Sequence, residues 1–124
     1  NHQFEFHKMK DGKTVFDYLI KKAPHVNFTL DVYWVQYGGA NIIDMIHRLK
    51  GRIECVHLKD YKINDELNPE FAPLGDGNID LKTVIKEAKK AGTKYFLIEQ
   101  DNAAEKKNGY QDIIKSIKYI KENF

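Results

Sequence analysis

The amino-acid sequence predicts an α/β fold built on a parallel sheet. Three apolar runs of strand length, at residues 26–31, 52–57 and 94–99, alternate with segments whose apolar residues recur at helical spacing. A repeated order of strand and helix is typical of parallel sheets, because each helix carries the chain back to the start of the next strand. The length of 124 residues suits one domain.

The predicted helices carry recognisable signals at their ends. They span residues 14–22, 41–50, 80–91 and 110–122. The first begins at Thr14, three residues before Asp17, which resembles a capping box with Asp in place of Glu. The second and third stop at Gly51 and Gly92, where a left-handed cap is expected, and the third begins at Asp80, a good N-cap residue.

The predicted strands have an apolar side and a polar side. In the first run, Phe28 and Leu30 would face the helices, whereas Asn27, Thr29 and Asp31 would point the other way, because side chains alternate along a strand. A polar side with small residues suits the interior of a barrel near its mouth better than a sheet face covered by helices.

The opening residues 1–6 (NHQFEF) resemble the end of a fourth strand. Four strand–helix units make half of an eight-stranded barrel, which typically needs about 250 residues. A half barrel would leave two open sheet edges and an exposed inner face. We therefore expect either that an N-terminal half of the barrel is missing or that association, for example as a homo-oligomer, completes the edges.

Composition narrows the class of protein. The net charge of +2 arises from 20 basic and 18 acidic residues, and this near balance argues against a dedicated nucleic-acid-binding protein. The single cysteine, Cys55, permits no intramolecular disulfide and fits a reducing compartment. No apolar run approaches the roughly 20 residues needed to span a bilayer. These features predict a cytoplasmic protein without a membrane or nucleic-acid partner.

Each of the three apolar runs ends on a residue type that binds metals or transfers protons: Asp31, His57 and Glu99. Parallel strands place their C-terminal ends on one rim, where sites are built in barrels and open sheets. Taken singly, such an aspartate is more often a helix cap and such a histidine a packing residue. Together, the oxygen and nitrogen ligands suit one divalent ion such as Mn²⁺, Co²⁺, Mg²⁺ or Zn²⁺, with His2 as a further possible ligand.

Other residues that follow the strands are candidates for binding a substrate. Trp34 would either wall a sugar ring or pack beneath a helix, and Lys59 would either hold a substrate oxygen or stay solvated at the surface. Asp60 would orient Lys59 or cap the loop after it. Gln100 and Asp101 would reach the ligand or only turn the chain. The long loop 61–78 has a Gly-rich base, and a loop of this length usually covers a site or is mobile.

These residues lie in motifs that resemble the C-terminal half of the xylose isomerase-like TIM barrels, a superfamily of sugar-phosphate isomerases and epimerases that also includes inosose dehydratases and endonuclease IV-type enzymes. The motifs are NHQFEF (1–6), LDVYW (30–34), GRIECVHLKD (51–60), LGDGNID (74–80) and FLIEQD (96–101). They occur in the family's order over nearly the whole chain. The resemblance implies that the predicted strands are the fifth to eighth of the barrel.

The resemblance also implies that Asp31, His57 and Glu99 are three of four ligands to one divalent metal ion. His2 would be the fourth ligand or line the pocket, since the opening motif resembles a His-Asn-His variant whose first histidine would precede Asn1. Trp34 stands where epimerase relatives place a histidine that contacts the substrate, and this departure leaves the substrate open.

The function implied is a metal-dependent isomerase or epimerase acting on a sugar, a sugar phosphate or a keto-sugar. The metal would polarise the carbonyl and stabilise an enediolate, Glu99 would be ligand and general base, and Lys59 would act beside it. Alternatives are an inosose dehydratase-like enzyme or a keto-sugar lyase or hydrolase. A DNA-repair endonuclease is disfavoured by the near-neutral charge. A further alternative, from another class, is an inactive half barrel or a structural or binding module.

Overall fold

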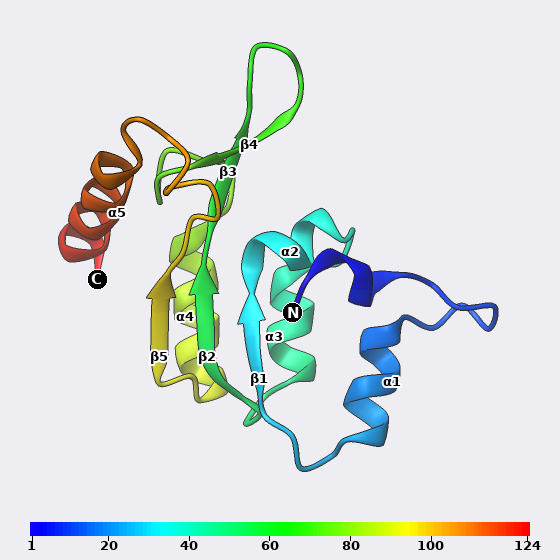
Figure 1. Ribbon diagram of the computed structural model, residues 1–124. Coiled ribbons are helices and arrows are strands. Elements are labelled where there is room, and N and C mark those ends of the chain that lie inside the picture. Colours follow the sequence, from blue (N-terminus) through cyan, green and yellow to red (C-terminus); the bar gives the residue numbers. More distant parts are fainter.

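A parallel sheet of three strands forms the centre of the computed structural model, which describes residues 1–124 (Figure 1). The strands lie in the order β1 (Phe28–Asp31), β2 (Ile53–Leu58) and β5 (Tyr95–Ile98). Asp31 lies opposite His57 in the pairing of β1 with β2. The predicted α/β fold with parallel strands is therefore confirmed.

The four predicted helices are present, and a fifth helix was not predicted. The helices are α1 (Val15–Lys22), α2 (Val32–Tyr37), α3 (Ile42–Arg48), α4 (Leu81–Ala91) and α5 (Gly109–Asn123). The capping box of α1 is confirmed: the Asp17 amide donates to Thr14 Oγ1 at 3.0 Å and the Thr14 amide donates to Asp17 Oδ2 at 2.7 Å. Gly92 ends α4 with φ of 100°. The extra helix α2 begins directly at the end of β1.

The prediction that residues 1–6 end a strand is wrong, because this segment forms the 3₁₀ helix η1 (Gln3–Phe6). Glu5 Oε2 accepts a hydrogen bond from the His2 amide at 2.6 Å, which favours a local turn over an extended chain. The segment still lies along the free edge of β1. The Asn1 amino group donates to the Thr29 carbonyl, and the Asp31 amide donates to Asn1 Oδ1 at 2.8 Å.

The predicted loop 61–78 contains an antiparallel hairpin of β3 (Asp60–Ile63) and β4 (Pro69–Ala72). The hairpin projects beyond the C-terminal ends of the parallel strands (Figure 1). The Gly-rich stretch that follows returns the chain to α4. Regular pairing within the segment explains how so long a connection can be ordered.

The core lies between one face of the sheet and the helices α3 and α4, which lie behind the sheet in Figure 1. Leu30 and Val56 are fully buried there, as the predicted alternation requires. On the opposite face Tyr95 and Leu97 are 59% and 49% exposed. The sheet therefore has one uncovered face, and the homo-oligomer that would complete it stays a prediction.

None of the helices combines the length and the apolar composition that crossing a bilayer requires.

Candidate metal centre

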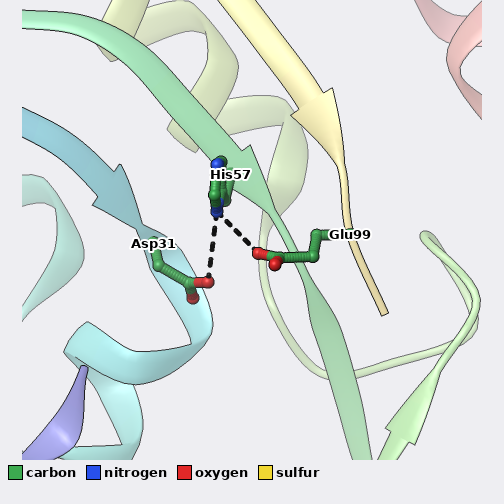
Figure 2. Close-up of side chains that lie close together, drawn as sticks. All are labelled: Asp31, His57 and Glu99. Carbon is green, nitrogen blue, oxygen red and sulfur yellow. Dashed lines mark ion pairs between the residues drawn. The ribbon is translucent and has the colours of Figure 1, made fainter. Parts of the chain in front are cut away.

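Asp31, His57 and Glu99 lie together at the C-terminal rim of the sheet, where Figure 2 shows their side chains pointing toward one another. His57 Nδ1 lies 2.6 Å from Glu99 Oε2 and 3.8 Å from Asp31 Oδ2. One nitrogen or oxygen atom of each residue lies within 4.8 Å of the others. The strand ends thus bring the three predicted residues together, and their role as metal ligands stays a prediction.

Asp31 serves two structural purposes at once. Its Oδ1 accepts a hydrogen bond from the Trp34 amide at 3.0 Å and so caps α2. Its Oδ2 points into the cluster toward His57 and Lys59. The two alternatives weighed from the sequence, helix cap and site residue, are therefore both present in one side chain, one oxygen to each.

Lys59 is buried beneath the cluster, with a side chain only 2% exposed. Its ammonium nitrogen lies 3.0 Å from Asp31 Oδ2, 3.3 Å from Glu99 Oε2 and 2.7 Å from Asp101 Oδ1. It also lies 5.4 Å from the centre of the Trp34 ring, within the range of a cation–π contact. Lys59 is therefore part of the site and not a solvated surface lysine.

Burial and ion pairing oppose each other in this cluster. Burial raises the pKa of Asp31 despite its contacts with the Trp34 amide and Lys59. For Glu99, burial works against ionisation, but the charges of Lys59 and His57 outweigh it and lower the pKa. Burial also works against the charged form of Lys59, but its carboxylate partners outweigh it and raise the pKa of the amine. The ammonium group is thus maintained at neutral pH.

The chemistry of the cluster fits a divalent cation. Two carboxylates and one imidazole are a ligand set that such ions accept. Glu99 Oε2 is buried and receives no well-directed hydrogen bond, although His57 Nδ1 lies only 2.6 Å away. Three carboxylates surround one ammonium group, which leaves an excess of negative charge that a cation would offset.

An open cleft of about 490 Å³ lies in front of the cluster. Trp34 and His2 both line it, and their rings stack with centroids 3.7 Å apart. His2 is not part of the group formed by the three candidate ligands, but its Nδ1 is buried without a hydrogen-bond partner. The structure thus places both predicted residues at the wall of the cleft, and binding of a substrate there stays a prediction.

Gln100 and Asp101 point in different directions. Gln100 Nε2 donates to Asp112 Oδ2 of α5 and to Asn102, and Gln100 is not among the residues that line the cleft. Asp101 lines the cleft and pairs with Lys59. The sequence offered a signal that Asp101 and not Gln100 would face the cleft. Asp101 follows Glu99 by two residues, and side chains two residues apart on an extended backbone lie on the same side.

Asp60 organises the loop and does not orient Lys59. Its carboxylate, 1% exposed, accepts hydrogen bonds from the amides of Tyr61, Gly75, Gly77 and Ile79. Burial nevertheless raises the pKa of this carboxyl. The side chain fastens the end of the Gly-rich stretch to the start of β3.

Replacing Asp60 by asparagine will destabilise the chain by about 2 kcal/mol, since one acceptor oxygen becomes a donor facing buried amides. Denaturation by urea, followed by circular dichroism, measures the loss. Asp65→Asn is the matched control, because Asp65 is an exposed aspartate in the turn between β3 and β4. Equal stability of the two variants would mean that the four hydrogen bonds do not hold the loop.

The same fold occurs among known proteins. The xylose isomerase-like TIM barrel family matches residues 2–122. Two solved structures of a sugar phosphate isomerase/epimerase from Parabacteroides distasonis ATCC 8503 superpose with a TM-score of 0.75 and 20% sequence identity. The superpositions cover 96% of this chain but only 43% and 44% of those chains. No protein of curated function matches significantly.

At this level of identity the solved structures establish the shared fold alone. The chain spans less than half of each of them.

Proposed function

We propose that this chain, which belongs to the xylose isomerase-like TIM barrel family, forms the catalytic rim of a sugar isomerase or epimerase that depends on one divalent cation. The observation that carries the proposal is the convergence of Asp31, His57 and Glu99 at the ends of adjacent parallel strands. Their position at the carboxyl end of the sheet is where such folds carry their chemistry.

The three side chains would hold the cation, which could be Mn²⁺, Co²⁺, Mg²⁺ or Zn²⁺. When bound, it supplies a Lewis acid that polarises a sugar carbonyl and makes the neighbouring C–H bond more acidic. The wall of the cleft would bind the sugar, because the stacked Trp34 and His2 rings offer an apolar surface for a sugar ring.

Exposure separates the roles of the two carboxylates. The Glu99 side chain is 40% exposed, whereas that of Asp31 is 3% exposed. Glu99 is therefore the more accessible carboxylate in the cleft, and we assign it the role of general base in addition to that of ligand. Lys59 lies beside it and would donate a hydrogen bond to the substrate oxygen on which negative charge develops.

Exchange of substrate hydrogen with solvent tests this function directly. In D₂O with Mn²⁺ present, the protein that contains this chain will incorporate deuterium next to the carbonyl of at least one ketose, aldose, sugar phosphate or inosose, as seen by mass spectrometry. Glu99→Gln will slow the exchange about 100-fold or more, as removal of a general base does. Exchange that proceeds equally in both proteins, or with none of these substrates, would contradict the proposal.

The same assay separates the alternatives of a dehydratase and a lyase. A dehydratase would give a product lighter by one water molecule, and a lyase would give two fragments. These alternatives are worth testing because Trp34 lies in the cleft. An indole cannot transfer the proton that a histidine in its place could.

A further inference from the structure

The ammonium group of Lys59 contacts three carboxylates that differ in their proposed duties. Asp31 and Glu99, at 3.0 and 3.3 Å from Lys59 Nζ, are candidate ligands of the cation. Asp101, at 2.7 Å, lies outside that ligand set. The contact with Asp101 is also the one in which the ammonium donates a well-directed hydrogen bond.

Binding of a divalent cation would change the surroundings of Lys59. The cation would take up the carboxylate oxygens of Asp31 and Glu99 that now face the ammonium group. A charged side chain that is only 2% exposed cannot be left without a partner at small cost. Asp101 is the carboxylate that stays available to it.

We propose that Asp101 is a positioning residue, which holds the Lys59 ammonium group at the cleft wall when a divalent cation occupies Asp31 and Glu99. This inference rests on the proposed metal site. The rings of Trp34 and Phe71, 5.4 and 5.9 Å from Lys59 Nζ, limit where the ammonium group can move. Both Lys59 and Asp101 line the cleft, so the pair presents a fixed hydrogen-bond donor to a sugar oxygen beside the cation.

Acylation of Lys59 by an amine-reactive ester tests the contact without any metal. The double variant Asp31→Asn with Glu99→Gln leaves Asp101 as the remaining carboxylate partner, and the amide introduced at position 31 retains an acceptor for the helix cap. Mass spectrometry will show that Lys59 of this variant reacts far more slowly than the exposed Lys118. Adding Asp101→Asn will accelerate labelling of Lys59 about tenfold. Adding Asp76→Asn, at an exposed aspartate that pairs with Lys115, will leave it unchanged.

The single variant Asp101→Asn tests the coupling to the cation. Saturating Mn²⁺ will leave Lys59 of the wild-type chain protected but will accelerate its labelling about tenfold in Asp101→Asn, and Asp101→Glu will restore protection. Equal labelling with and without Asp101 in both experiments would overturn the proposal. If the wild-type chain bound no Mn²⁺, the metal site itself would fail, whereas the metal-free experiment would still decide whether Asp101 holds Lys59.

Discussion

Replacing His57 by asparagine will weaken the binding of a divalent cation by at least about 100-fold, and Asp31→Asn will do the same. Loss of a residue that only hydrogen-bonds to a metal ligand already weakens metal binding by about 10- to 100-fold. Each of these two changes removes a ligand atom itself. Asparagine is the informative substitute for Asp31, because its side-chain oxygen still accepts the hydrogen bond from the Trp34 amide that caps α2. The fold is therefore retained while the charged ligand is lost.

Isothermal titration with Mn²⁺ and elemental analysis of the purified chain measure this effect, with about one ion per wild-type chain expected. His47→Asn is the matched control, since His47 is an exposed histidine of α3 that pairs with Glu87 outside the cluster. It will bind the ion like the wild type. Full metal content in His57→Asn or in Asp31→Asn would show that these residues are not ligands.

The sequence predicted that Asp31, His57 and Glu99 would lie together, because all three stand at strand ends. The register that places Asp31 opposite His57 follows from parallel pairing, and parallel pairing follows from the alternation of strands and helices. Side-chain alternation then fixes which face each residue occupies. These are short-range rules, and they are sufficient to bring three distant residues to one rim.

Long-range packing explains what the sequence did not reveal. The burial of Lys59 depends on Trp34 and Phe71, which lie near its ammonium nitrogen but far from it in the chain. A lysine after a strand is usually solvated, and nothing local to residues 57–60 indicated otherwise. The same holds for Asp60, whose hydrogen-bond donors come from residues 15 to 19 positions away as well as from its neighbour.

Two errors in secondary structure have local causes. Residues 1–6 have the apolar alternation of a strand, but a hydrogen bond between Glu5 and the His2 amide and burial of Phe6 favour η1. The short helix α2 follows β1 without a connecting loop. Its start signal was the cap residue Asp31, which was also the candidate metal ligand.

Replacing Lys59 by methionine will destabilise the metal-free chain by about 3–5 kcal/mol. Methionine keeps much of the side-chain volume but leaves buried Asp31 without its cationic partner, and removal of one member of a buried ion pair has a cost of this size. Glu99 and Asp101 are more exposed, so solvent screens their charges and the loss of their interaction with Lys59 adds little to the destabilisation. Urea denaturation measures the change. Lys118→Met, at a side chain that is 73% exposed, will alter stability by about 0.5 kcal/mol or less.

Lowering the pH and adding a divalent cation will each restore part of the stability lost in Lys59→Met, for the same electrostatic reason. Burial already raises the pKa of Asp31, and removal of the ammonium group will raise it further. Protonation then neutralises Asp31, so the difference in stability between Lys59→Met and the wild type will shrink as the pH falls. A divalent cation would supply positive charge beside Asp31 and, at 100 times its Kd for Lys59→Met, will raise the stability of this variant by about 2.7 kcal/mol above its metal-free value. A loss in Lys59→Met that responded to neither condition would mean that packing around the lysine, and not its charge, holds the rim together.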